Sequence, residues 1–228
     1  MPRPFDEAAH ARRRDGFLDA AQHLLQTVGF DAMSVQDVLA RTGASKGAFY
    51  HYFDSKSDLL DAVLDRMFEE MLASAAPAIR DSELSALERL NRFFAGQGAW
   101  KTARRPLVLA AARAWYGDAN AVARVRMRRR SAEEFARLLT DVVRLGVAEG
   151  VFDVDDPRVA ARMVYALLQD FHDGLIDWFT TDRRATPEQV AEVIDAVAGY
   201  QTGMERVLAA PRGAIHLVDA DTMRDWLT

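Results

Sequence analysis

The sequence predicts an all-α fold, in which a small N-terminal helix-turn-helix domain precedes a larger helical domain. Three observations support this prediction. Apolar residues recur at three- and four-residue intervals along most of the 228 residues. The helix-start patterns Asp156-Pro157 and Thr186-Pro187 precede long apolar stretches. Near the N-terminus, a turn at Gly43 separates two short capped segments.

The first helix is predicted from an apolar stripe that ends at Gly29. Its positions are Phe17, Ala20, Ala21, Leu24, Leu25 and Val28. Arg12, Arg13 and Arg14 lie at the start of this helix and form a local basic patch.

Two short helices follow, joined by a tight turn. Ser34 and Asp37 form a capping-box pattern, so the second helix is expected to begin near Val35. Gly43 can adopt the left-handed conformation that ends this helix, and Ser45 offers its hydroxyl as the next N-cap. This arrangement is a helix-turn-helix.

The third helix is predicted to have one packed face and one free face. Phe49 and Phe53 lie four residues apart and can anchor it, whereas Lys46 and Tyr50 share another face. Residues 38–53 include no Asp or Glu. The free face can therefore approach an anionic partner.

A fourth helix is expected from a second capping-box pattern, Ser55 with Asp58, to about Pro77. Its apolar stripe comprises Leu59, Leu60, Val63, Leu64, Met67, Phe68, Met71 and Leu72. Lys56 lies in its first turn, where a cation is unfavourable unless an anion such as a DNA phosphate is also present.

The remaining chain is also predicted to be helical, with caps or prolines marking most starts. Three helices are expected from Asp81 or Ser82 to about Lys101, from Pro106 to Trp115, and from Asp118 to Gly150. Two longer apolar helices follow, from Pro157 to Trp178 and from Pro187 to Leu208, and a short one at about 221–227.

Composition narrows the function classes. The chain has no cysteine, which excludes disulfides and thiolate metal sites. Its net charge of −5 argues against a general nucleic-acid coat, so DNA binding has to come from a local basic patch. Neither a signal peptide nor a membrane-spanning stretch is evident, and we expect the protein in the cytoplasm.

The N-terminal quarter resembles the TetR-type transcriptional regulators. The resemblance rests on Ala20, Ala21, Gly29-Phe30, Ser34, Val38, Gly43-Ala44-Ser45 with Gly47, Phe49-Tyr50-His51-Tyr52-Phe53, Lys56 and Leu59-Leu60. Leu39 and Thr42 depart from the family's usual alanines, and Tyr52 stands where histidine is common. These differences concern packing and leave the motif intact.

The resemblance implies a domain plan and a mechanism. Residues 1–55 would bind DNA, residues 56–210 would bind an effector and dimerise, and residues 211–228 would form a tail. The last two long helices would pair with their copies in a homodimer that binds a near-palindromic operator. A small, largely hydrophobic effector would release this repressor from DNA, with no cofactor and no enzymatic activity.

The resemblance also assigns DNA-binding roles by position. The expected contacts are Ser34, Gln36, Ser45, Lys46, Gly47, Ala48, Tyr50, His51, Tyr52 and Lys56. Lys46, Gly47, Ala48 and Gln36 would approach base edges, and His51 could contact bases or phosphates. The other residues would bind phosphates, which fix the register of the complex. Alternatively, the two serines are only caps and Tyr50 is only a surface aromatic residue.

Candidate effector contacts are large apolar residues with polar groups nearby in the sequence. They are Trp100, Arg113, Trp115, Phe171, His172 and Trp178. Ordinary core or dimer packing is the competing interpretation of each. A metal or acid–base site at His172 with Asp170 and Asp173 is disfavoured, because these positions do not all share one helical face.

The basic run of Arg124, Arg126, Arg128, Arg129 and Arg130 points around its helix rather than to one partner. A solvated face paired with Glu133 and Glu134 is the expected role, with recognition of an anionic effector as the alternative.

Three other functions remain open from the sequence. A DNA-binding regulator could act without a small-molecule effector. An all-helical enzyme would need a convergent catalytic set and would show turnover without DNA. An interaction module using the helix-turn-helix as a scaffold would show no salt-dependent DNA affinity.

Overall fold

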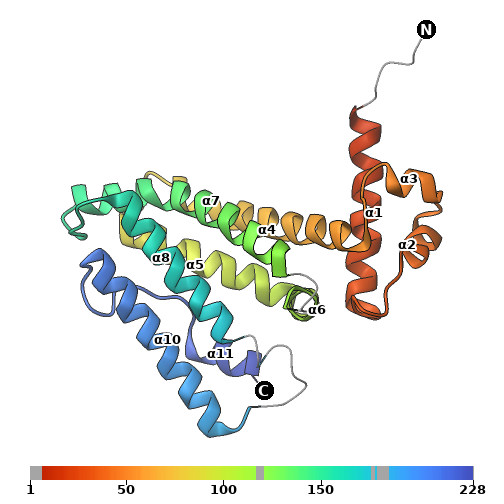
Figure 1. The fold of residues 1–228 in the computed structure, drawn as a ribbon. Coiled ribbons are helices and arrows are strands. Elements are labelled where there is room, and N and C mark those ends of the chain that lie inside the picture. Colours follow the sequence, from red (N-terminus) through yellow and green to blue (C-terminus); the bar gives the residue numbers. More distant parts are fainter. Residues whose placement is uncertain (1–6, 117–120, 176–177, 179–184, 228) are drawn as a thin grey trace. The chain divides into compact units, whose positions relative to one another are not determined.

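The computed structural model describes residues 7–116, 121–175, 178 and 185–227, with only the backbone at 121–124, 126 and 127. All regular secondary structure within these residues is helical (Figure 1). The helices are α1 (Glu7–Thr27), α2 (Val35–Thr42), α3 (Lys46–Tyr50), α4 (Lys56–Arg80), α5 (Ala86–Ala103), α6 (Arg105–Trp115), α7 (Ala121–Ala148), α8 (Pro157–Gly174), α10 (Pro187–Leu208) and α11 (Ala220–Leu227). The predicted all-α fold class is confirmed.

The chain divides into two compact units. The first comprises residues 1–69 and 105–123, and the second comprises residues 70–104 and 124–228. The first unit thus contains α6 and the first part of α4 in addition to α1, α2 and α3. The tail from residue 211 is part of the second unit.

Aromatic packing forms the core of the first unit. The Phe17 ring of α1 meets Phe49 edge-on, with centroids 5.7 Å apart, and meets Phe53 at 6.1 Å. All three side chains are buried. α1 also packs against α2 and α6. These contacts hold the helix-turn-helix on α1 and confirm Phe49 as the anchor of α3; because α3 ends at Tyr50, Phe53 packs from the segment after the helix rather than from the helix itself.

The second unit has its own core, built from helices that are distant in sequence. Phe93 of α5, Phe135 of α7 and Met204 of α10 are almost completely buried. α8 and α10 pack along each other. Both long helices begin as predicted, with Asp156 and Thr186 capping them and proline in the first turn.

The C-terminal segment crosses the second unit and is tied to it by hydrogen bonds. The Asn91 side chain donates to Ala214 O at 2.8 Å and accepts from His216 N at 2.9 Å. In α11, Trp226 Nε1 donates to Thr102 Oγ1 at 3.1 Å. The short C-terminal helix predicted at about 221–227 is confirmed.

Two predicted boundaries were wrong. α4 continues to Arg80 with Pro77 inside it, because Ala75, Ala76 and Ile79 around the proline are buried. α5 begins after Ser85 rather than at Asp81 or Ser82, because Ser85 and Glu88 complete a capping box. The Asp81 carboxylate instead accepts the backbone N–H of Glu83 in the preceding turn.

Two further predictions need correction and one is not covered. α8 ends at Gly174, so Trp178 is not part of it. Ser55 Oγ accepts from Asp58 N as expected, but the Asp58 carboxylate accepts from Asp54 N rather than from the cap residue. The predicted helix start at Asp118 lies outside the described residues.

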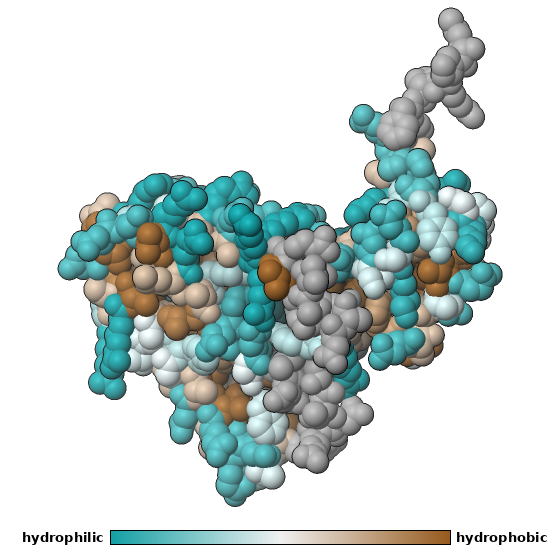
Figure 2. All heavy atoms as spheres, in the orientation of Figure 1, coloured by the Kyte–Doolittle hydropathy of each residue, from teal (hydrophilic) through white to brown (hydrophobic). Residues whose placement is uncertain are grey.

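The surface in Figure 2 is mostly hydrophilic, with small apolar patches. None of the helices in the described part combines the length and hydropathy needed to cross a membrane.

Candidate functional site

The second helix of the helix-turn-helix starts with a complete capping box. Ser34 Oγ accepts from Asp37 N at 3.2 Å, and the Asp37 carboxylate accepts from Ser34 N at 2.8 Å. These hydrogen bonds stabilise the charged carboxylate and lower the pKa of Asp37. Because Ser34 and Gln36 are exposed in the first turn, the cap fixes how both are presented.

The turn into α3 has the geometry that the sequence predicts. Gly43 has φ 64°, a left-handed conformation that favours glycine. Ser45 caps α3 by accepting from Ala48 N at 3.2 Å. Both serines therefore act as helix caps. Their contacts with DNA phosphates stay a prediction.

The free face of α3 is exposed. Lys46, Gly47 and His51 are solvent-exposed, and 47% of the Tyr50 surface is accessible. Lys46 Nζ lies 5.9 Å from the centre of the Tyr50 ring, which also meets the Phe49 ring edge-on at 5.2 Å. A Cβ built on Gly47 meets no atom within 4 Å, which leaves space for close approach of a partner.

Tyr52 and His51 rest against α1. The Tyr52 ring lies 4.5 Å from that of His10 and 5.8 Å from that of Phe17. The His51 ring meets His10 edge-on at 5.6 Å. Packing therefore orients both predicted DNA contacts, although only His51 is fully exposed.

Lys56 has a structural role that the sequence did not indicate. Its Nζ donates to Phe30 O and Met33 O at 2.9 Å each and to Asp31 O at 3.4 Å, and it lies 4.4 Å from the Phe30 ring centre. An ammonium has three N–H donors. Lys56 therefore holds the loop between α1 and α2 in place, which explains a cation at a helix start.

The predicted effector residues are divided between the two units. Trp100 and Phe171 are buried in the second unit, where Trp100 stacks with Arg104 and Phe171 packs on Tyr200. Arg113 and Trp115 lie on α6, in the first unit. Trp178 is half-buried after the end of α8.

His172 meets a partner from a distant part of the sequence. Its Nε2 lies 2.8 Å from Lys101 Nζ, and both side chains are part-buried. Burial lowers the pKa of Lys101 to about 8. Burial, with the Lys101 charge adding to it, lowers the pKa of His172 well below its usual value. A neutral imidazole can accept the lysine N–H.

The acidic neighbours of His172 in sequence have other partners. Asp173 accepts two hydrogen bonds from Arg128, at 2.6 and 2.7 Å. Asp170 accepts from the Tyr200 hydroxyl at 2.5 Å. In the part of the chain that the structure describes, no three His, Asp or Glu side chains are grouped to hold a metal ion.

The basic run on α7 splits between two roles. Arg129 and Arg130 form ion pairs with Glu133 and Glu134, at 3.8 and 3.5 Å, as the solvated-face interpretation predicts. Arg128 instead turns to Asp173 of α8. The side chains of Arg124 and Arg126 lie outside the described residues.

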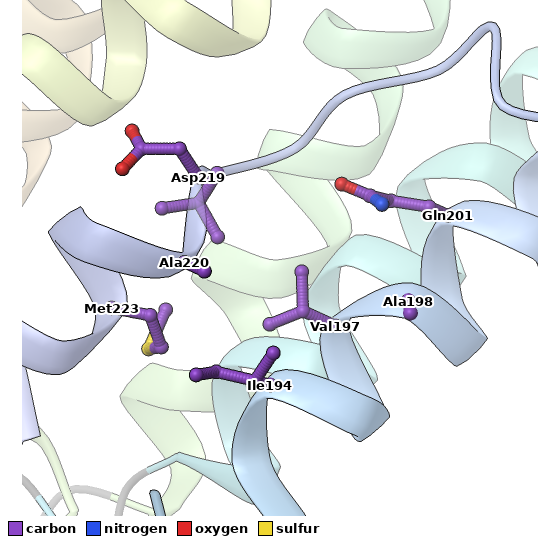
Figure 3. Close-up of a pocket in the computed structure, with 8 residues that line it drawn as sticks. Ile194, Val197, Ala198, Gln201, Asp219, Ala220 and Met223 are labelled. Atoms are coloured by element: carbon purple, nitrogen blue, oxygen red, sulfur yellow. The ribbon is translucent and has the colours of Figure 1, made fainter. Parts of the chain in front are cut away.

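A small pocket lies between α10 and the start of α11 (Figure 3). Ile194, Val197 and Met223 give it apolar walls, with Gln201 and Asp219 at its rim. It includes none of the predicted effector contacts. Its walls come from α10 and from the segment that leads into α11.

The buried polar residues of the second unit were not predicted from the sequence. Gln97 and Ser131 are buried, and Lys101 contacts a histidine 71 residues away. Spacing of Gln97 and Lys101, four residues apart on one helix, could have shown that they share a face. No local pattern could have shown which helix they meet.

Comparison with known families covers most of the chain. Residues 17–63 match the model of the bacterial regulatory proteins, tetR family, and residues 83–199 match the tetracyclin repressor-like C-terminal domain. The second match spans more than half of the 228 residues.

Individual relatives agree with both matches. The HTH-type transcriptional repressor KstR2 of Mycolicibacterium smegmatis is 28% identical over 186 residues, covering 80% of this chain and 86% of that protein. A transcriptional regulator of Pseudomonas aeruginosa PAO1 is similar in structure, with a TM-score of 0.59 and 27% identity over 87% of this chain and 94% of that one.

A TetR-family regulator of Pectobacterium atrosepticum shares the fold, with a TM-score of 0.67 over 91% of this chain and all of that one, at 20% identity. The exposed helix-turn-helix, the two matched domains and these relatives lead to one conclusion: the chain belongs to the TetR family of bacterial regulatory proteins.

Proposed function

We propose that the protein is a sequence-specific DNA-binding repressor, which acts in the cytoplasm as a homodimer and leaves its operator when a small molecule binds the second unit. The observation that carries the proposal is the free face of α3. Lys46 and Gly47 are exposed on a helix whose other face is anchored by Phe49. An acid-free helix that presents lysine beside glycine suits entry into the major groove.

Base and phosphate contacts would divide between neighbouring positions. Lys46 can donate to guanine acceptors and Gln36 can pair with adenine, while Ala48 can contact a thymine methyl group. Tyr50 and the two capping serines would bind phosphates beside them. Lys56 would act mainly by positioning the loop before α2, because its donors already meet loop carbonyls.

Dimerisation would supply a second helix-turn-helix, so that two DNA half-sites can be bound. A single helix-turn-helix contacts few base pairs, and two copies related by a twofold axis bind half-sites about one helical turn apart. α8 and α10 already pack together, and α8 exposes Val159 and Met163, four residues apart, at 45% and 51%. This apolar stripe supports a dimer interface on these helices.

The repressor assignment is supported by the KstR2 relative, which is named a transcriptional repressor and matches four-fifths of this chain. Release by a small molecule follows if that molecule binds better to a dimer whose two α3 helices no longer match successive major grooves. DNA and effector would then bind antagonistically through linked equilibria. This mechanism needs no catalytic turnover.

The proposal is tested by operator affinity as a function of salt and of the α3 face. Fluorescence anisotropy with a labelled duplex should show an affinity that falls steeply with salt, because phosphate binding releases counterions. The double variant Lys46→Ala, Tyr50→Ala should lose this affinity while keeping the wild-type melting temperature, since both residues are exposed. Equal affinity of the two proteins would contradict the proposal.

A further inference from the structure

A polar layer lies between three helices of the second unit, above an aromatic cluster. Phe135 of α7 stands between Phe93 of α5, at 5.3 Å, and Tyr165 of α8, at 5.0 Å. Further along α5 and α8, Lys101 and His172 meet at 2.8 Å. α5 and α8 thus meet directly at Lys101 and His172, and Phe135 of α7 bridges them at the aromatic level.

The register between these levels follows from helix geometry. Phe93 and Lys101 are eight residues apart, and Tyr165 and His172 are seven apart. At about 1.5 Å per residue, both pairs span roughly 11 Å along their helices. The two helices therefore run parallel here, and Gln97 lies on the α5 face midway between the two levels.

The groups between the levels are polar and buried. Gln97 is 4% exposed, and in the described part of the chain its Nε2 has no hydrogen-bond acceptor. Ser131 of α7 is 5% exposed, beside the Tyr165 hydroxyl. A buried amide donor without an acceptor is uncommon in native proteins, because leaving it unpaired is costly. Gln97 thus lacks an acceptor that a ligand could provide.

Lys101 has no carboxylate partner among the described residues. Within the described residues its ammonium meets only the imidazole of His172, which can accept one of its three N–H donors. The nearby carboxylates are engaged elsewhere, Asp173 by Arg128 and Asp170 by Tyr200. A part-buried cation beside an unpaired amide donor favours an anion.

We propose that this layer, defined by Gln97, Lys101 and His172, binds the anionic group of the effector, a carboxylate or a phosphate. An oxygen of that group would accept hydrogen bonds from the Lys101 ammonium and the Gln97 amide. The inference rests on the proposed function, because it names the chemical class of that repressor's effector. It places the charged end of the effector between α5 and α8, and it leaves the surface pocket at α11 out of effector binding.

The probes are matched acids and amides, together with inorganic phosphate. Thermal melting of the full-length protein without DNA would be followed with octanoate, cinnamate and salicylate, with the primary amide of each, and with phosphate. Carboxylates and not amides should raise the melting temperature if the group bound is a carboxylate, and phosphate alone should do so if it is a phosphate. Equal shifts by acids and amides, or no shift by any anion at about 10 mM, would overturn the inference.

Two variants locate the effect. Lys101→Met keeps the length of the side chain and removes its charge, and Gln97→Met removes the unpaired amide in the same way. Both should melt at or above the wild-type temperature without ligand, because each replaces a poorly compensated buried polar group. Both variants should bind the anion more weakly. For Lys101→Met we expect the affinity to fall by about 10- to 100-fold, because a hydrogen bond to a charged group usually contributes that much to binding.

The matched control is Arg129→Met, which removes a cation from the solvated face of α7 and should keep the wild-type response. A full response in Lys101→Met would overturn the site. Failure of the proposed function can be distinguished from failure of the site. If an anion binds in a Lys101-dependent manner but leaves operator affinity unchanged, the site is upheld. The anion is then rejected as the effector that releases the protein from DNA.

Discussion

At the scale of single residues, a substitution of Gly47 should have opposite effects on stability and on DNA affinity. The position is helical and a Cβ there meets no atom, so Gly47→Ala should stabilise α3 by up to about 1 kcal/mol. If the α3 backbone approaches the bases closely, the added methyl group should weaken operator affinity by about tenfold, or roughly 1.4 kcal/mol. Chemical denaturation and anisotropy measure the two effects.

The control for this prediction is Gly98→Ala in α5, where a Cβ also meets nothing within 4 Å. It should stabilise without altering DNA affinity. An unchanged operator affinity in Gly47→Ala would show that the glycine is not needed for close approach.

Lys56 offers a second residue-scale prediction. Lys56→Met removes hydrogen bonds to three loop carbonyls, and we expect the free energy of unfolding to fall by about 1 to 2 kcal/mol, because bonds to a charged donor are strong but this one is part-buried. Lys46→Met, on the exposed face, should leave stability unchanged. Urea titration distinguishes them, and equal stability of the two variants would reject the positioning role of Lys56.

The pH dependence of stability should reveal His172. Its folded-state pKa lies well below 6.5, so below pH 6.5 the unfolded chain binds a proton that the folded chain does not. Stability should therefore fall as pH drops from 7.5 to 5.5, by about 1 kcal/mol from this group. Urea unfolding of wild type and His172→Gln measures the difference, because the variant lacks this loss.

Other titrating groups act outside that window. Hydrogen bonds at the helix caps lower the pKa of Asp37 and Glu88, so their contribution is lost only in acid. Lys101 has a pKa of about 8 against 10.5 in the unfolded chain, so its effect is a rise in stability between those values. A wild-type profile identical to that of His172→Gln between pH 5.5 and 7.5 would contradict the burial of a neutral imidazole.

At the scale of elements, the end of α7 depends on one close contact. A Cβ on Gly146 would lie 2.0 Å from the ring of Phe152. This ring is buried and packs back against α7 from the segment that follows the helix. Gly146→Ala should destabilise the protein by about 1 to 3 kcal/mol through overpacking. Thermal or urea unfolding measures it against Gly98→Ala, and a variant as stable as that control would refute the contact.

The elements of the fold were largely predictable because their signals are local. Capping boxes, Gly43 and the proline starts of α8 and α10 act within one turn of the chain. The failures have tertiary causes. Pro77 would end an isolated helix at a cost of about 3 kcal/mol, but burial of its neighbours on α4 outweighs that cost.

The candidate sites differ in the same way. The residues of the exposed α3 face all lie in one short segment of the chain, so they could be predicted from the sequence. The layer at Lys101 and His172 joins helices 71 residues apart, and periodicity says which residues share a face but not which face they meet. Lys56 is unusual at a helix start, but its loop partners depend on the fold of the first unit.

At the scale of the whole molecule, one dimer would combine two functions. The first unit would bind the half-sites and the second would bind the anion, so each ligand alters the affinity of the other by the same factor. The effector can shift the equilibrium only by its difference in affinity for the two states. Neither unit alone would behave as a regulated repressor.

We expect this dimer to bind a specific, near-palindromic DNA sequence. Selection from randomised duplexes by the purified full-length protein tests it most directly, with Lys46→Ala, Tyr50→Ala as the control. We predict enrichment of one near-palindrome with half-sites about one helical turn apart, absent with the variant. A folded wild-type dimer that enriches no sequence at low salt would contradict sequence-specific DNA binding.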